Sequence, residues 1–130
     1  QRQMCIRDSM YRVGVDLVEI ARIEKSVKSR RFTERVFSEK EIALFSSIKN
    51  ALESMAGNWA AKEAFSKALG TGVRNFSLNE VSVLRDELGA PYIELTGCAK
   101  RIAEEAGLEF TVSITHTAQL AQAVCIAYKK

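Results

Sequence analysis

Residues 57–72 read Gly-Asn-Trp-Ala-Ala-Lys-Glu-Ala-Phe-Ser-Lys-Ala-Leu-Gly-Thr-Gly, and the fold follows from what this stretch can form. Its alanines and its unbranched Lys and Glu favour helix, and an apolar stripe continues backwards from it at steps of three and four. The pattern predicts a helix of about five turns over residues 51–69. Gly70 supplies a left-handed stop, and Gly72 a flexible loop beyond it.

The second half of this predicted helix carries polar side chains. Lys62, Glu63, Ser66 and Lys67 follow one another at spacings of one, three and four, which places them on adjoining parts of the helix surface. Trp59 precedes Glu63 by one turn, so we expect Glu63 at the edge of the buried face. A solvated Glu63–Lys67 pair worth about 0.3–0.5 kcal/mol would explain the pattern without any function.

The whole chain has an ordinary composition for a globular protein. It has 130 residues, of which 47% are hydrophobic and 27% charged, and no run approaches the length of a membrane span. Residues 1–9 back-translate to a sequence that looks like the mosaic-end adapter of a sequencing transposon, so we exclude them from fold reasoning. We expect one domain over residues 10–130, and Cys98 and Cys125 suggest reduced thiols in a cytoplasm.

Strands at both ends with helices between them predict an α+β fold with a largely antiparallel sheet. Ser38 and Glu41 match a capping box that opens a helix. Residues 32–37 read as a connection. Strands are expected at 11–15, 80–86, 92–95, 110–114 and 121–128, and further helices at 18–27, 38–45 and 97–106.

Positive charge gathers on the expected helix 18–27. Arg22, Lys25 and Lys28 lie mostly opposite its apolar side. A charge run of this kind is usually a solvated helix face, and the alternative is a docking surface for an acidic protein. The net charge of +3 is too mild to indicate nucleic acid by itself.

Two carboxylates are candidates for metal chemistry. The sequence has no zinc-like Cys/His pairs, no Walker loop and no Gly-x-Ser-x-Gly elbow. Asp16 at the end of the first strand and Glu63 on the central helix would suit Mg²⁺, which takes one or two carboxylates together with water and substrate phosphate. Neighbouring lysines would offset phosphate charge. Asp16 could equally be the N-cap of the next helix, and no spacing rule brings it to Glu63.

Three segments in this order resemble the bacterial holo-acyl-carrier-protein synthases, which are small single-domain phosphopantetheinyl transferases. The segments are Gly14-Val-Asp-Leu-Val-Glu-Ile, Trp59-Ala-Ala-Lys-Glu-Ala-Phe-Ser-Lys-Ala-Leu-Gly-Thr-Gly and Ser113-Ile-Thr-His-Thr. The resemblance extends from Met10 to Lys130. It implies transfer of the phosphopantetheine arm of coenzyme A to a serine of apo acyl carrier protein, with release of adenosine bisphosphate. It also implies Mg²⁺ dependence and a homotrimer with active sites at subunit interfaces.

The resemblance assigns roles by position. It makes Asp16 and Glu63 the metal ligands, and directs Lys62 and Lys67 to the phosphates or the attacking serine. Glu63 could also assist proton removal. His116 and Thr117 would lie near the ribose phosphate of the coenzyme, Gly70, Thr71 and Gly72 would shape the loop over the nucleotide, and Arg22 and Lys25 would dock the acidic carrier protein.

One position departs from the pattern of the family. Asn58 stands where many members have arginine, and Trp59 where they have phenylalanine. Trp59 keeps a buried aromatic ring. The loss of a cation at residue 58 predicts weaker discrimination between coenzyme A and its dephospho form.

Three other functions compete with this one. The same fold could retain coenzyme A or carrier protein without turnover, or the basic helix could bind nucleic acid. The enzyme could also serve a secondary-metabolite carrier in place of the carrier of fatty acid synthesis.

Overall fold

Helix α5, Ala51–Leu69, runs through the middle of the molecule in the computed structural model, which describes residues 11–70 and 75–130. Its predicted bounds are confirmed, and Gly70 ends it in the left-handed conformation with φ of 90°. The other elements are β1 Tyr11–Glu19, α2 Ile20–Ser26, α3 Arg30–Val36, α4 Glu39–Ser46, η1 Leu78–Glu80, β2 Val81–Arg85, β3 Pro91–Leu95, α6 Gly97–Ala106, β4 Leu108–His116 and β5 Leu120–Lys129. The expectations for residues 1–9, Thr71 and Gly72 lie outside the described residues.

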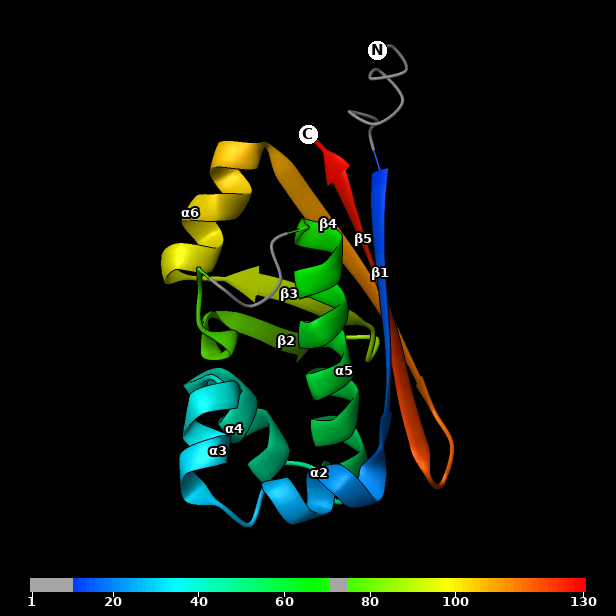
Figure 1. Cartoon of the computed structure of the whole chain (residues 1–130). Coiled ribbons are helices and arrows are strands. Elements are labelled where there is room, and N and C mark those ends of the chain that lie inside the picture. The colour runs from blue at the N-terminus through cyan, green and yellow to red at the C-terminus, as the bar shows by residue number, and fades with distance from the viewer. Residues whose placement is uncertain (1–10, 71–74) are drawn as a thin grey trace.

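Two antiparallel sheets flank α5. The larger has the strand order β1-β5-β4, and the smaller is the β2–β3 hairpin. Figure 1 shows α5 between them, with α2, α3 and α4 gathered at its N-terminal end and α6 near its C-terminal end. The predicted α+β fold with antiparallel pairing is confirmed.

The contact between α5 and β1 is close because small residues line it. Ala60, Ala64 and Ala68 on α5 are fully buried. A Cβ at Gly14 would overlap the carbonyl oxygen of Ala64, so only glycine allows β1 to lie this near the helix backbone. The strand that carries Asp16 is therefore held directly against α5.

Two sequence predictions about the N-terminal third were wrong in detail. Strand β1 continues through Glu19, so Asp16 lies inside a strand and not at its end. Residues 30–36 form helix α3 where a connection was expected, because the Ser29 side chain accepts a bond from the Phe32 backbone N–H at 3.2 Å.

Side chains also fix the starts of two helices. The predicted Ser38–Glu41 capping box opens α4 and is confirmed. Helix α6 has its predicted bounds, but the Thr96 side chain makes no capping bond. The Glu80 carboxylate accepts instead from the backbone N–H groups of Cys98 and Ala99, at 3.1 and 3.2 Å. In the described ranges, no helix has both the length and the apolar character that crossing a membrane requires.

Candidate active site

Strand β1 and helix α5 bring two acidic side chains to one place. Asp16 shares the α5-facing side of β1 with Gly14 and Val18, both of which are buried. Glu63 stands on the part of α5 that faces Asp16, half-buried as expected, and the two charges act on each other. The pairing that the sequence could not establish is therefore present within one chain.

The carboxylate pair carries more negative charge than its surroundings neutralise. Burial raises the pKa of Glu63 above its ordinary value, and the nearby charge of Asp16 raises it further, while Lys67 acts in the opposite direction. A group with a raised pKa of this origin is stabilised by a proton or by a cation. The site therefore favours a positively charged ligand.

Lys67 lies at the rim of this pair. Its Nζ donates to the backbone carbonyl of Val15 at 2.8 Å and lies 3.3 Å from Asp16 Oδ1. Its side chain is 55% exposed, so the amine can also reach a ligand that approaches from solvent. The ion-pair partner of Lys67 is therefore Asp16, and not Glu63 as in the solvated helix pair considered from the sequence.

The donor set fits a hard divalent cation that shares its shell with a substrate. Asp16 and Glu63 supply oxygen ligands from two elements. Among the described residues no group of three or more His, Cys, Asp or Glu side chains could enclose a metal. Mg²⁺ commonly binds through one or two carboxylates and fills its remaining positions with water and substrate phosphates, which matches this open arrangement.

Lys62 does not belong to this site, which corrects the prediction that it faces the phosphates or the attacking serine. Its side chain is fully buried, and its Nζ lies 2.6 Å from Glu41 Oε1. The same amine donates to the carbonyl oxygens of Leu78, at 3.0 Å, and of Val81. Burial lowers the pKa of Lys62, and the Glu41 charge partly offsets this effect.

Asn58 is also buried, which removes the basis for the predicted effect on coenzyme discrimination. Its Nδ2 donates to Glu41 Oε2 at 2.8 Å and to the Val83 carbonyl at 2.9 Å. Its Oδ1 accepts from Arg85 at 2.9 Å. A side chain held in this way does not face a nucleotide.

Trp59 packs as the sequence suggested. It is partly buried between the main hydrophobic core and a smaller cluster of Val36, Phe37 and Phe45, with its ring 5.7 Å from that of Phe32. The two rings line a cavity of about 280 Å³ beside α3 together with Arg35 and Leu78.

His116 and Thr117 lie away from the carboxylate pair of the same chain. His116 ends β4, and its Nδ1 is 3.8 Å from the carboxylate of Glu53 in the first turn of α5. Glu53 and Glu63 are ten residues apart, which is about 15 Å along a helix axis. The Thr117 hydroxyl accepts from the backbone of the turn between β4 and β5. Within one chain, His116 and Thr117 therefore lie apart from Asp16 and Glu63.

The remaining predicted residues that the structure describes are Arg22, Lys25 and Gly70. Arg22 and Lys25 are exposed on α2, beside the buried Ile20 and Ile23. Gly70 is the left-handed residue after α5, and a side chain there would meet the guanidinium of Arg12.

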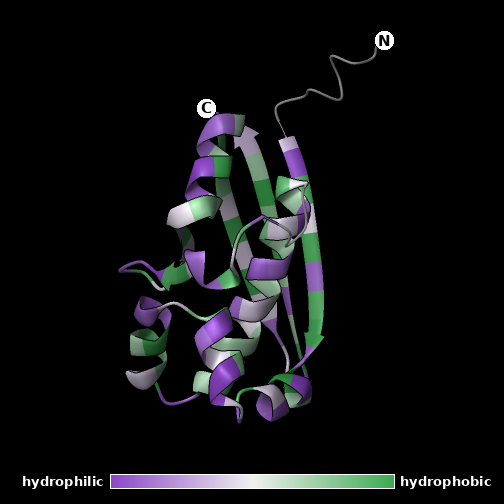
Figure 2. Ribbon diagram, turned by 60° about the vertical axis from the view of Figure 1, so that its left-hand side comes forward, coloured by the Kyte–Doolittle hydropathy of each residue, from purple (hydrophilic) through white to green (hydrophobic). Residues whose placement is uncertain are grey.

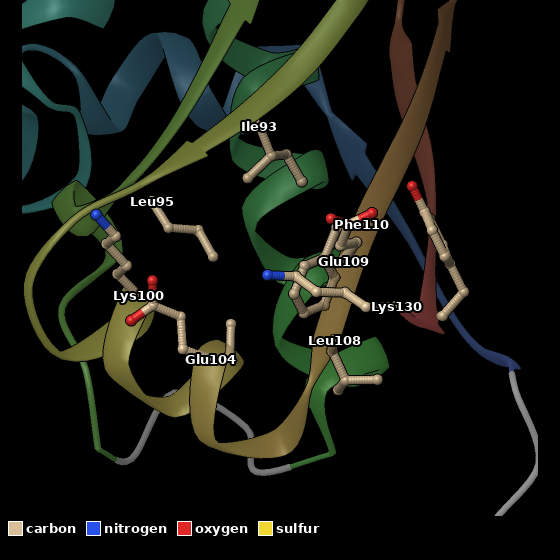
Figure 3. A pocket seen from close by; sticks show the side chains of 10 residues that line it. Ile93, Leu95, Lys100, Glu104, Leu108, Glu109, Phe110 and Lys130 are labelled. Carbon is tan, nitrogen blue, oxygen red and sulfur yellow. The ribbon is translucent and has the colours of Figure 1, made fainter.

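A further cavity of about 330 Å³ lies between β3, α6 and the start of β4 (Figure 3). Ile93, Leu95 and Leu108 form apolar walls, with Lys100 and Glu104 from α6 nearby. None of the predicted site residues that the structure describes lines this cavity. It is separate from the carboxylate pair.

A weak sequence signal exists for Glu41, the buried partner of Lys62. Glu41 precedes Phe45 by one helical turn, and Phe45 is part of an apolar cluster. A carboxylate on that line must find a buried partner. The capping box alone accounts for a glutamate at this position, so sequence reasoning missed its pairing with Lys62.

Comparison with known proteins gives one consistent result. Residues 12–125 match the family described as the 4′-phosphopantetheinyl transferase superfamily. The holo-[acyl-carrier-protein] synthase of Alkaliphilus oremlandii is 42% identical over 117 residues, which cover 88% of this chain and 96% of that protein.

Two solved structures have the same fold. One is the holo-(acyl-carrier-protein) synthase of Bacillus anthracis in complex with CoA (3′,5′-ADP), with a TM-score of 0.80 and 30% sequence identity. The match covers 94% of this chain and 100% of the B. anthracis chain. The enzyme of Neisseria meningitidis gives a TM-score of 0.86 at 29% identity, with 92% and 99% covered. The chain is therefore an enzyme that belongs to the 4′-phosphopantetheinyl transferase superfamily.

Proposed function

We propose that the protein is a holo-acyl-carrier-protein synthase, which transfers the phosphopantetheine arm of coenzyme A to a serine of apo acyl carrier protein. The observation that carries the proposal is the meeting of Asp16 and Glu63, with Lys67 at their rim. The B. anthracis relative was solved with CoA (3′,5′-ADP), which supports coenzyme A as the donor and adenosine bisphosphate as the product.

The reaction exchanges one phosphorus–oxygen bond for another. The serine oxygen of the carrier bonds to the phosphorus nearer the pantetheine, the bond to adenosine bisphosphate breaks, and the hydroxyl proton leaves. Asp16 and Glu63 would hold Mg²⁺, which when bound supplies positive charge to the phosphoryl oxygens and the leaving group. Lys67 adds a second cation there. Glu63 carries a carboxylate that can accept the proton, directly or through water.

A homotrimer with interface sites would reunite the separated residues, because His116 and Thr117 of one copy could approach the carboxylates of another. The outer face of β1 supports such an assembly, since apolar side chains lie at alternate positions along the strand, where Figure 2 shows green residues between hydrophilic ones. Their exposed fractions are 63% for Tyr11, 63% for Val13, 45% for Val15 and 58% for Leu17. Val13 and Val15 pair with Ile126 and Val124 of β5, which continue the apolar surface.

The basic face of α2 is the proposed dock for the acidic carrier protein. Arg22 and Lys25 are exposed there and project from a short helix anchored by Ile20 and Ile23. Arg22→Ala should raise the KM for the carrier a few-fold and flatten its dependence on salt, with kcat unchanged. Unchanged KM and salt dependence would move the dock elsewhere.

The cellular setting follows from the same proposal. We propose that residues 10–130 act as one domain in the cytoplasm and serve fatty acid biosynthesis. Burial raises the pKa of the Cys125 thiol to about 12, which makes it an unreactive packing group.

The decisive experiment is incubation of the protein with coenzyme A, Mg²⁺ and apo acyl carrier protein, followed by intact mass spectrometry. The carrier should gain one phosphopantetheine group, and carrier with its serine changed to alanine should gain none. An unmodified carrier together with tight coenzyme A binding would instead support the binding module. Chelation of the metal should stop the reaction.

A further inference from the structure

A buried polar network lies on the side of α5 away from the carboxylate pair. Glu41 of α4 is fully buried, and its two oxygens accept four hydrogen bonds. Oε1 accepts from Ser38 N at 3.0 Å and Lys62 Nζ at 2.6 Å. Oε2 accepts from Asn58 Nδ2 at 2.8 Å and Val83 N at 3.2 Å. This carboxylate thereby joins α4, α5 and β2.

Lys62 completes the network from the side of α5. Its three N–H donors meet three acceptors, namely Glu41 and the carbonyl oxygens of Leu78 and Val81. The amine also lies 5.6 Å from the centre of the Phe37 ring. A lysine with this set of partners has one allowed position.

The apolar contacts of α5 are less directional than this network. Toward β1 it presents the small side chains of Ala60, Ala64 and Ala68, and its Phe65 ring packs against Phe76 and Phe110. Hydrogen bonds from Asn58 and Lys62 depend on direction as well as distance, so they constrain the rotation of α5 about its own axis.

Rotation of α5 decides where Glu63 points. A turn of about 20° would move a carboxylate that lies about 6 Å from the helix axis by about 2 Å. A Mg²⁺ ion requires near-ideal geometry at about 2.0–2.1 Å from its ligands, so a displacement of that size would break the site. Lys62 is the immediate neighbour of Glu63 in the chain, so anchoring one residue orients the other.

We propose that Glu41 and Lys62 are positioning residues that hold α5 at the rotation in which Glu63 meets Asp16. The inference rests on the proposed function, because it treats Glu63 as a metal ligand. Both side chains are fully buried and bond to protein groups. Groups that orient metal ligands in this indirect way typically change metal affinity by 10- to 100-fold when they are removed.

Stability alone is a weak reason for such a network. Replacing a buried ion pair with apolar residues of similar volume is often neutral or stabilising, whereas removal of one partner is costly. Because removing one partner and replacing both have different effects on stability, the orientation of α5 and the stability of the protein can be measured separately. A double variant can recover stability without recovering the directional bonds.

The test compares Lys62→Met and the double variant Glu41→Gln/Lys62→Met with the wild-type protein. The probe is Mn²⁺ in the presence of coenzyme A, measured by electron paramagnetic resonance at a temperature where circular dichroism shows each sample folded. Ser66→Ala is the matched control, because Ser66 lies one turn beyond Lys62 on the same buried line and bonds only within α5. We expect about a tenfold or larger loss of Mn²⁺ affinity in the folded Lys62 variants and none in Ser66→Ala.

The double variant keeps the test valid where Lys62→Met alone does not fold, because it removes the unpaired buried charge. Folded Lys62 variants that bind Mn²⁺ with wild-type affinity would overturn the inference and leave the proposed function intact. A wild-type protein that neither binds Mn²⁺ with coenzyme A nor loads a carrier would overturn the proposed function itself. The two failures are thus distinguishable.

Discussion

Two lines of side chains run along α5, one residue apart in register. Asn58, Lys62 and Ser66 form the inner line, with exposed fractions of 0%, 0% and 2%. Trp59, Glu63 and Lys67 form the outer line, which is open to solvent at Glu63 and Lys67. Each line contains a lysine that meets a carboxylate, Glu41 inside and Asp16 outside.

The difference shows that partners, more than residue type, decide what a lysine does. Lys62 has all three donors occupied by protein groups in a closed interior. Lys67 has its carboxylate partner at 3.3 Å, with more than half of its side chain in solvent. The inner amine can anchor the helix, and the outer amine can still bind a ligand.

The largest expected effect comes from removing charge on the outer line. Glu63→Gln should lower carrier loading by about 10³-fold, because several kcal/mol of charge stabilisation depend on the ion it would hold. The rate is measured by intact mass against time, with Glu105→Gln, an exposed carboxylate on α6, as the control. A variant that keeps a tenth of the activity would break the assignment of chemistry to the outer line.

Substitutions on the inner line should mainly change the stability of the protein. Lys62→Met leaves the Glu41 carboxylate buried and unpaired, which should lower the free energy of unfolding by about 3–5 kcal/mol. Urea unfolding followed by circular dichroism gives this value. A loss below about 1 kcal/mol would show that the interior tolerates a lone carboxylate, and the contrast between the lines would disappear.

Lys67→Met tests the same substitution on the outer line. We expect kcat to fall by about 10²-fold, the usual size for loss of one charge-stabilising donor. Stability should change by less than about 0.5 kcal/mol, because the pair with Asp16 is partly exposed. Steady-state kinetics beside a urea titration separates the two effects, and a large stability loss with normal kcat would reverse the roles of the two lysines.

Gly14→Ala changes the distance between the outer line and Asp16 without touching the inner line. The added methyl group overlaps the Ala64 carbonyl and contacts the Ala68 nitrogen, so β1 must move away from α5. We expect a stability loss of about 1–3 kcal/mol, together with weaker Mn²⁺ binding. Gly89→Ala is the control, because its Cβ meets nothing, although its positive φ makes it mildly strained. Unchanged metal binding in Gly14→Ala would show that Asp16 tolerates movement of its strand.

The smallest effect is a pH dependence at Glu63. The folded protein raises the pKa of Glu63 above its ordinary value of 4.5, so the contribution of this group to stability is present below that value and is lost as pH rises through the folded pKa. Without metal, Glu63→Gln should therefore be more stable than the wild type at neutral pH, and the difference should vanish in acid. Thermal unfolding with a chelator, at neutral pH and near pH 4, measures it. Equal stabilities at neutral pH would mean that Lys67 fully compensates the carboxylate pair.

Sequence reasoning could find the helix but not the direction in which each of its polar lines faces. Periodicity placed Lys62 and Lys67 on adjoining parts of one surface, whereas the structure buries Lys62 and exposes Lys67. Which of them is buried depends on Glu41, 21 residues earlier in the chain, and on carbonyl oxygens of β2 and η1. The meeting of Asp16 with Glu63 likewise depends on tertiary packing, because Gly14 permits a close approach that no local spacing encodes.

Local signals succeeded where one short segment contains every interacting group. The Ser38–Glu41 box and the Gly70 stop needed no distant partner, and both are confirmed. Helix α6 was also predicted correctly, although its capping carboxylate, Glu80, comes from another part of the chain.

The direct backbone contact between Gly14 and Ala64 has a consequence for how the protein can diverge. Because no side chain separates the strand from the helix, the distance between the backbones that carry Asp16 and Glu63 is set by direct contact between those backbones. Apolar core residues away from this contact can therefore change size while the two backbones keep their separation.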